Sequence, residues 1–489
     1  MLRIAEIFLT ALLVSAVGTW ALIRFNDRLS LTAAPTVDRW HKRPTPNSGG
    51  LAILLACAVG YLLYLPGYSR LTTFLAACFS VLGFIDDRVR LAPLPKLAVQ
   101  VVLTAVVIAA GNIFSPTPWY WFNAAVTLLW IVGITNAFNL IDNMDGLCAG
   151  VVVIVAAFRI LLLARHGSMQ EAGATALIAG AFFGFLLFNY HPAKIFMGDC
   201  GSVLAGFGLA NLAISSPVAH ATSSLSAIVC AALTFSYPIF DTALVSFLRR
   251  ASGRPISIGG RDHSSHRLGS LGLGETTVVW LLWAMAALGG AAGLLLDASP
   301  LVIMVAALVT GILFLVFGMF LGTLPAYPVA IEAGMFGHGP ILRALPVLRV
   351  GATLWLDGLL SAVSLISAFM LRWGTELPLH RHQVLVHALP IVALCHMVSS
   401  LVSRTFCISW RAFDIGDALR VGGAAALGGA LAFGITVGVH LGEFTLGELL
   451  LYIAICSILS ILVRASLRIM AWALGSGACH GERIGSPAR

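Results

Sequence analysis

The chain has 489 residues, of which 59% are hydrophobic and only 10% are charged. Because a soluble domain carries about 25% charged residues, this composition excludes a soluble enzyme, a disordered chain and a coiled coil, and it predicts a polytopic membrane protein. The net charge of +8 comes from basic residues in loops between apolar runs, which favours a role in membrane topology over nucleic-acid binding. None of the nine cysteines forms a C-x-x-C pair, so neither a zinc site nor a disulfide framework is predicted.

About 15 apolar runs follow one another along the chain, each a candidate transmembrane helix. They fall near residues 4–23, 49–65, 71–85, 97–110, 119–135, 147–164, 173–189, 202–215, 224–247, 275–296, 300–322, 351–371, 384–403, 418–440 and 446–472. The first run lacks a small-x-small cleavage site, which favours a membrane helix over a signal peptide. The sequence therefore predicts an all-α polytopic fold.

The distribution of basic residues predicts the orientation. An odd number of spans places the termini on opposite sides of the membrane. With the N-terminus in the periplasm and the C-terminus in the cytoplasm, most of the 29 Lys and Arg residues lie in cytoplasmic segments, as the positive-inside rule requires.

The composition changes near residue 323, where the chain becomes less apolar and richer in proline. This change is typical of a linker or a re-entrant segment. We therefore expect an eleven-span module at 1–323, a linker at 324–350, a four-span module at 351–475 and a cytoplasmic tail at 476–489.

Five polar clusters interrupt the apolar pattern, and the predicted topology places all of them on the cytoplasmic side. They are residues 38–50, 83–100, 136–150, 188–202 and 253–268. Their carboxylates are Asp86, Asp87, Asp142, Asp145 and Asp199, and their cationic or titratable groups are Arg43, Lys96, Lys194, Arg261, His263, His266 and Arg267. Carboxylates suit Mg²⁺ and cations suit pyrophosphate oxygens, so the combination predicts a phosphoryl-transfer site.

Simpler interpretations of these residues remain open. Asp86 and Asp87 could be a solvated loop pair with Arg88 and Arg90 as partners. The i,i+3 spacing of Asp142 and Asp145 places both on one helix face, but they could merely cap the next span. Asp199 could likewise be an N-cap. Asp241, inside the ninth run, could pair with Arg249 or a neighbouring helix, and we assign no function to it or to His191.

Taken together, the five clusters resemble the polyprenyl-phosphate N-acetylhexosamine-1-phosphate transferases over about residues 1–320. In that family a prenyl phosphate attacks the β-phosphate of a UDP-sugar, with Mg²⁺ (or Mn²⁺) as cofactor, and releases UMP. The resemblance implies that the paired acidic motif is Asp86 and Asp87, with its following lysine at Lys96. It implies that the Asn-x-x-Asn-x-x-Asp-x-x-Asp-Gly motif is Asn136, Asn139, Asp142, Asp145 and Gly146.

The same resemblance assigns three further positions. The metal-ligand aspartate is Asp199, the aromatic residue that stacks on uracil is Phe196, and the histidine-rich loop contains Arg261, His263 and His266. We count Asp86, Asp87, Lys96, Asp142, Asp145, His263 and His266 as catalytic candidates. The substrate-binding candidates are Arg43, Asn136, Asn139, Lys194, Phe196, Arg261 and Arg267.

The sequence also departs from the family pattern. Ser265 stands where the loop often has its middle histidine, and the triple-histidine loop of the peptidoglycan branch is absent. This favours a small UDP-N-acetylhexosamine over UDP-MurNAc-pentapeptide. Asn143 stands where many relatives have Gly, and Asn47 replaces a basic residue common after Pro-Thr-Pro.

Residues 340–475 resemble, more weakly, the four-helix membrane module that precedes sugar-nucleotide dehydratase domains in polysaccharide biosynthesis. The matching segments are 357–373 and 403–421. No dinucleotide G-x-G-x-x-G motif occurs there. We interpret the module as an accessory anchor or a docking site for a pathway partner. For the chain as a whole, the expected protein partners are other proteins of the polysaccharide pathway or a second copy in a homodimer.

The sequence thus predicts a Mg²⁺-dependent transferase of the inner membrane, with its active site on the cytoplasmic face. It would move an N-acetylhexosamine-1-phosphate, in particular GlcNAc-1-phosphate, from a UDP-sugar to undecaprenyl phosphate, and so initiate a lipopolysaccharide or another cell-surface polysaccharide. The alternatives are a transporter or lipid flippase, and a scaffold for polysaccharide assembly. A transporter is expected to carry charges near the bilayer midplane and internal repeats, neither of which we find in the sequence.

Overall fold

The structure is a computed structural model of the chain. It describes residues 1–25, 32–33, 45–115, 117–215, 224–251, 254–255, 260–298, 300–322, 324, 340–374, 378–408, 413–438 and 444–475. Arg43, one of the substrate-binding candidates, lies outside these residues.

The chain forms two compact units. The first comprises Met1–Ser246, Ile256–Gly269 and Leu273–Asp297, and the second comprises Phe247–Pro255, Ser270–Gly272 and Ala298–Arg489. The division lies earlier than the expected boundary at 323, because the helix formed by residues 300–322 belongs to the second unit. The domain limits drawn from composition stay a prediction.

The first unit is almost entirely helical. Its helices are α1 (Leu2–Arg24), α3 (Gly49–Tyr64), α4 (Arg70–Val89), α5 (Pro93–Ala109), α6 (Tyr120–Ile141), α7 (Leu147–Arg165), α8 (Met169–Asn189), α9 (Gly198–Ser215), α11 (Ser224–Thr234), most of α12 (Ser236–Ala251), α13 (Ser264–Gly269), α14 (Glu275–Gly293) and the 3₁₀ turn η1 (Leu294–Asp297). The strands β1 (Thr32–Ala33) and β2 (Thr45–Pro46) pair antiparallel.

The predicted helical, multi-pass architecture is confirmed. Every predicted apolar run falls on a helix, and within the described residues ten helices are long and apolar enough to cross a membrane. The run 224–247 is broken, since α11 and α12 meet at an angle of 77°. The helices α3, α5 and α9 are apolar but shorter. The count of 15 crossings and the orientation stay predictions.

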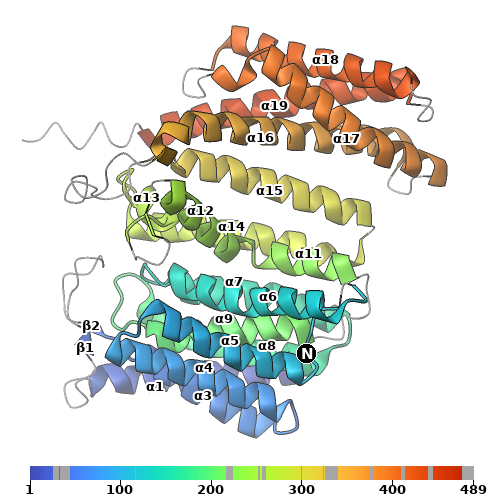
Figure 1. The fold of residues 1–489 in the computed structure, drawn as a ribbon. Coiled ribbons are helices and arrows are strands. Elements are labelled where there is room, and N and C mark those ends of the chain that lie inside the picture. Colours follow the sequence, from blue (N-terminus) through green and yellow to red (C-terminus); the bar gives the residue numbers. More distant parts are fainter. Residues whose placement is uncertain are drawn as a thin grey trace, which may run out of the picture. The chain divides into compact units, whose positions relative to one another are not determined.

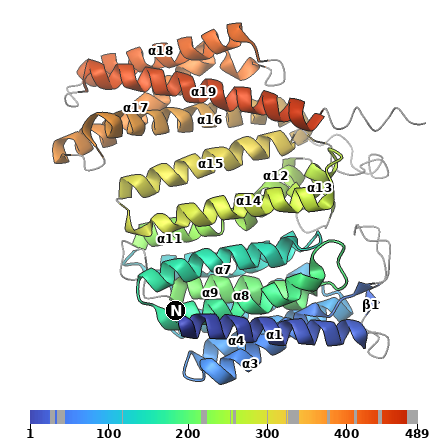
Figure 2. The ribbon, with the colours of Figure 1, turned by 180° about the vertical axis from the view of Figure 1, so that it is seen from behind.

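The polar segments of the first unit gather at one end of its helices. In Figure 1, β1, β2 and α13 lie at the left, whereas the N-terminus lies at the right, and Figure 2 shows the same separation from behind. A buried apolar cluster that includes Leu75, Phe79, Ile131, Val203 and Phe207 joins α4, α6 and α9. The rings of Phe79 and Phe207 stack with centroids 4.3 Å apart. This packing fixes where the polar ends of the three helices stand.

The second unit contains five long helices. They are α15 (Pro300–Gly322), α16 (Pro340–Trp373), α17 (Leu379–Val402), α18 (Ile415–Gly438) and α19 (Leu446–Gly475), with the 3₁₀ turn η2 (Thr405–Cys407). The four-helix expectation for residues 351–475 matches α16–α19. Residues 340–350, which the sequence analysis placed in the linker, are helical, because α16 begins at Pro340.

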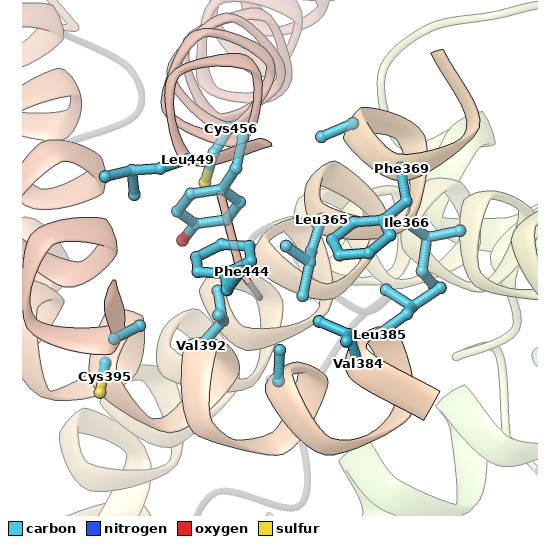
Figure 3. Close-up of a cluster of buried hydrophobic side chains, with 14 of the residues drawn as sticks. Leu365, Ile366, Phe369, Val384, Leu385, Val392, Cys395, Phe444, Leu449 and Cys456 are labelled. Atoms are coloured by element: carbon cyan, nitrogen blue, oxygen red, sulfur yellow. The ribbon is translucent and has the colours of Figure 1, made fainter. Parts of the chain in front are cut away.

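The helices α16–α19 enclose an apolar core. Figure 3 shows its side chains pointing toward one another, among them Leu365 and Phe369 of α16, Val392 of α17 and Cys456 of α19. A buried ion pair joins α16 to α19 in this unit: Arg464 donates to Asp357 at 2.7 Å, and both residues are 1% exposed or less. A buried pair of this kind requires each charge to keep its partner.

Candidate active site

An acidic cluster with one lysine at its centre lies at the polar end of the first unit. The Nζ of Lys96 is 2.8 Å from Oδ2 of Asp86, is hydrogen-bonded to Asp199 and donates to Oδ1 of Asn139 at 3.2 Å. These residues come from α4, α5, α6 and α9, and the side chains of Lys96 and Asp86 are 12% and 14% exposed. The structure therefore brings together four predicted site residues far apart in the sequence.

Asp86 and Asp87 point to different partners although they are adjacent on α4. Asp86 accepts from Lys96 and, through Oδ1, from the backbone N–H of Leu91 at 2.7 Å. Asp87 accepts the backbone N–H groups of Asp199 and Cys200 at 3.0 and 3.1 Å. Consecutive side chains on a helix diverge by about 100°, so Asp86 faces the lysine while Asp87 holds the start of α9. The solvated-loop interpretation of this pair is wrong.

Two glycines allow α4 and α9 to approach this closely. A Cβ on Gly83 would overlap the backbone carbonyl of Asp199, and a Cβ on Gly198 would overlap the Asp87 carboxylate. Gly198 also has φ of +69°, a left-handed conformation that favours glycine. The hydroxyl of Ser80 adds a buried hydrogen bond to the carbonyl of Cys200 at 3.0 Å. Asp199 is thus held in the first turn of α9 by backbone contacts, and it is bonded to Lys96 rather than acting as an N-cap.

The asparagines of α6 extend the cluster. Asn139 accepts from Lys96 and donates to Ser202 at 3.0 Å. Asn136, one turn earlier, donates to Gln100 of α5 at 2.7 Å. Both predicted residues therefore join α6 to its neighbours at the site.

The aspartates that follow α6 do not share a helix face, which corrects the expectation from their spacing. The helix ends at Ile141, Asp142 is its C-cap, and Asp145 lies in the turn before α7. Asp145 accepts the backbone N–H of Ala193 at 2.9 Å. Its Oδ2 and an oxygen of Glu275 each lie 3.1 Å from Nδ1 of His191. This group of one imidazole and two carboxylates can hold a metal ion, but hydrogen bonding by itself also explains it.

The histidine-rich loop is anchored by a buried carboxylate. Asp241 on α12 accepts from Nδ1 of His263 at 2.7 Å and from the backbone N–H of Ser264 at 2.8 Å. Ser265 donates to Asn143 at 2.7 Å, which joins the loop to the turn after α6. Burial lowers the pKa of His266 to about 4, with the neighbouring His263 and Arg261 as further causes. His266 is therefore neutral near pH 7 and would contact a substrate by hydrogen bonding rather than by charge.

The remaining candidates surround this end of the unit. Phe196 is placed by backbone pairing, since its N–H donates to Pro46 at 2.8 Å and its carbonyl accepts from Gly49 at 2.9 Å. Lys194 is exposed. Arg267 is buried, and its Nε donates to the carbonyl of Asp262 at 2.9 Å.

Sequence reasoning missed several residues that the structure places at the site. Asp241, to which the sequence analysis assigns no function, binds His263. Asn47, noted only as a departure, donates to Asp87 at 3.1 Å. His191 and Glu275 join Asp145. A carboxylate inside an apolar run, as at Asp241, was the available signal, but its partner lies 22 residues away and cannot be identified from spacing.

The acidic cluster has the donor set of a divalent-cation site. The carboxylates of Asp86 and Asp199 both bind the ammonium of Lys96, and Asp87 adds a third carboxylate, bonded to the backbone N–H of Asp199. The net formal charge of these four side chains is negative, and the ligand atoms are hard oxygens of the kind that Mg²⁺ prefers. The ammonium of Lys96 already lies among oxygens of Asp86, Asp199 and Asn139, which shows that this position accommodates a cation.

A multi-pass helical fold with this cluster at one end defines a membrane-embedded transferase, and comparison with known proteins agrees. Residues 69–217 match glycosyl transferase family 4. The Bacillus subtilis protein named "Probable undecaprenyl-phosphate N-acetylglucosaminyl 1-phosphate transferase" is 31% identical over 296 residues, which cover 58% of this chain and 82% of that protein. The decaprenyl-phosphate N-acetylglucosaminephosphotransferase of Mycobacterium tuberculosis is 31% identical, covering 58% and 79%.

A phospho-N-acetylmuramoyl-pentapeptide-transferase of Heliobacterium modesticaldum is also similar, at 32% identity over 57% of this chain and 93% of that protein. The chain belongs to the polyprenyl-phosphate N-acetylhexosamine-1-phosphate transferase family that its motifs resemble.

Proposed function

We propose that the chain transfers N-acetylglucosamine-1-phosphate from UDP-GlcNAc to undecaprenyl phosphate and releases UMP, so starting a cell-surface polysaccharide on its lipid carrier. The reaction would take place at the cytoplasmic face of the inner membrane. The observation that carries this proposal is the acidic cluster, because Asp86 and Asp199 meet at Lys96 and Asp87 binds the backbone of Asp199 in a chain of this family.

In the proposed reaction a phosphate oxygen of the prenyl phosphate forms a bond to the β-phosphorus of the UDP-sugar. The bond from that phosphorus to the oxygen bridging to the α-phosphate breaks, and this oxygen leaves with the electron pair as part of UMP. Phosphoryl transfer of this kind depends mainly on positioning and charge stabilisation. The protein therefore has to hold two anionic substrates in line.

The acidic cluster divides these tasks among its residues. Asp86 and Lys96 form a pair that can orient the prenyl phosphate, with the ammonium offsetting phosphate charge. Asp87 fixes the first turn of α9, so that the Asp199 carboxylate keeps one orientation. Asp199 would be the main ligand of Mg²⁺, which when bound neutralises the diphosphate and polarises its oxygens.

No strong base is required for the attack. The second pKa of a phosphate monoester is about 6, so the prenyl phosphate is already largely dianionic near neutral pH. A direct attack is therefore proposed, without a phosphoryl-enzyme intermediate. Trapping a covalent sugar-phosphoryl adduct in the absence of prenyl phosphate would contradict it.

The test uses the purified full-length chain in detergent or proteoliposomes, with undecaprenyl phosphate and Mg²⁺ or Mn²⁺. UDP-GlcNAc, UDP-GalNAc and UDP-6-deoxy sugars are compared as donors, and UMP release is measured. We expect metal-dependent release of UMP with UDP-GlcNAc as the preferred donor, and chelation with EDTA should abolish it. Movement of prenyl lipid across the bilayer without UMP release would instead support a flippase.

A further inference from the structure

Among the described residues, the Asp241 carboxylate binds the start of the histidine-rich loop through both of its oxygens. Asp241 is 0% exposed. Its Oδ2 lies 2.7 Å from Nδ1 of His263, and its Oδ1 accepts the backbone N–H of Ser264 at 2.8 Å. Both carboxylate oxygens therefore address two consecutive residues of the loop.

Burying a carboxylate costs free energy unless it has partners. An apolar side chain at this position would avoid that cost but could not form the two hydrogen bonds to the loop. The bond to Ser264 anchors the backbone. The bond to His263 does more, because it occupies one ring nitrogen and fixes the rotation of the ring. The nitrogen left for a substrate is then Nε2. A carboxylate behind the ring also stabilises the imidazolium when an anion binds in front of it.

The loop lies where such an anion is expected. The hydrogen bond from Ser265 to Asn143 joins it to the turn that carries Asp142 and Asp145. Arg261 and Arg267 belong to the same short segment. A histidine fixed in this basic segment is suited to donate a hydrogen bond to a phosphoryl oxygen.

We propose that Asp241 is a positioning residue that orients His263 so that its Nε2–H donates to a phosphoryl oxygen of the UDP-sugar. This inference rests on the proposed function, and it adds a residue from outside the five polar clusters. Asp241 itself does not touch the substrate, and its effect on transfer is exerted through the His263 ring.

The experiment is a double-mutant cycle in the full-length chain, with UMP release as the readout. In Asp241→Asn the side chain is uncharged and its amide can donate to Nδ1, so the imidazolium that donates from both ring nitrogens loses the carboxylate that stabilises it. We expect kcat/KM to fall about 100-fold or more in Asp241→Asn and in His263→Gln. In the His263→Gln background, Asp241→Asn should change kcat/KM by less than about threefold, since the ring it acts through is absent.

Asp241→Glu covers the case in which the uncharged variant does not fold. The charge is kept but displaced by one methylene, so we expect a loss of at least about tenfold when His263 is present. In the His263→Gln background, Glu and Asp at this position should be equivalent. Tyr237→Phe is the matched control, because its hydroxyl lies 3.3 Å from Oγ of Ser264, in the same loop. We expect less than about a threefold change for Tyr237→Phe, as for an interaction that orients no reacting group.

Multiplicative effects of Asp241 and His263 substitutions, or a wild-type rate in Asp241→Glu, would overturn the inference and make Asp241 a structural tether. A wild-type chain that releases no UMP from any UDP-sugar would refute the proposed function instead. The two failures are therefore distinguishable in the same assay.

Discussion

At the scale of single residues, the arrangement around Asp199 separates the residue proposed to bind metal from the residues that support it. Its carboxylate is bonded to Lys96, while its backbone N–H is bonded to Asp87. Side-chain chemistry at residue 199 can therefore be changed without releasing the backbone of α9.

We predict that Asp199→Asn is expressed and folds as the wild type does. Its rate of UMP release at saturating Mg²⁺ should fall at least about 100-fold. Loss of a metal ligand costs several kcal/mol of transition-state stabilisation, and about 1.4 kcal/mol corresponds to tenfold in rate. Asp297→Asn is the control, because that carboxylate binds His166 and has no proposed role in transfer. Activity of Asp199→Asn above about a tenth of wild type would refute the metal assignment.

Lys96 offers a second prediction at this scale. Its Nζ fits between Asp86 and Asp199, and its side chain is only 12% exposed. A planar guanidinium is larger and directs its donors differently. We therefore expect Lys96→Arg to reduce kcat by at least about tenfold although the charge is kept. Equal kcat values for Lys96→Arg and the wild type would show that only the charge matters.

At the scale of elements, the site depends on how closely α4 approaches α9. We predict that Gly83→Ala lowers both the thermal stability and the rate of UMP release, because the added methyl would overlap the carbonyl of Asp199. Gly133→Ala on α6 is the matched control, since its Cβ would meet nothing within 4 Å. That control should be neutral, or stabilise by up to about 1 kcal/mol. Unchanged activity in Gly83→Ala would show that the helices can separate without harm.

The contact between the histidine-rich loop and the turn after α6 gives another element-scale prediction. Asn143 and Ser265, both departures from the family pattern, form a hydrogen bond of 2.7 Å. We expect Asn143→Ala and Ser265→Ala to be non-additive, with a coupling of about 0.5–3 kcal/mol in transition-state stabilisation measured as kcat/KM. Strictly additive losses would indicate that the bond does not contribute to the position of the loop.

At the scale of the whole molecule, each of the two units has its own core, and the acidic cluster belongs to the first. We propose that α16–α19 act as an accessory module, for membrane anchoring or for docking a pathway partner or a second copy. Asp357→Asn breaks the buried pair with Arg464, which should cost about 3–5 kcal/mol in the stability of the second unit.

The expected result is a lower unfolding temperature in detergent for Asp357→Asn with UMP release per folded molecule unchanged. Replacing Asp357 and Arg464 together by apolar residues should recover much of the stability. If a folded Asp357→Asn chain binds UDP-sugar but transfers nothing, the second unit takes part in the reaction, and the accessory interpretation is wrong.

Much of the fold could be predicted from the sequence, because membrane helices are determined locally. A run of apolar residues has to satisfy its backbone hydrogen bonds within itself, so the described residues of the predicted runs are helical, with one break between α11 and α12. The site could be predicted in part for a different reason: the polar residues that interrupt these runs are costly unless they have a function. Lys96, Asp86 and Asp199 were found in this way and meet in one cluster.

Tertiary structure decided the rest, because a side chain's partner depends on packing between helices distant in sequence. Composition did not reveal that Asp87 holds the start of α9, or that Asp142 and Asp145 lie in a turn instead of on one helix face. Nor did it reveal that Asp241 binds His263. The sequence by itself determined where the apolar helices lie and which polar groups need an explanation. Packing, through contacts such as Gly83 against Asp199, determined which of those groups meet, since close approach requires shape complementarity that no local pattern specifies.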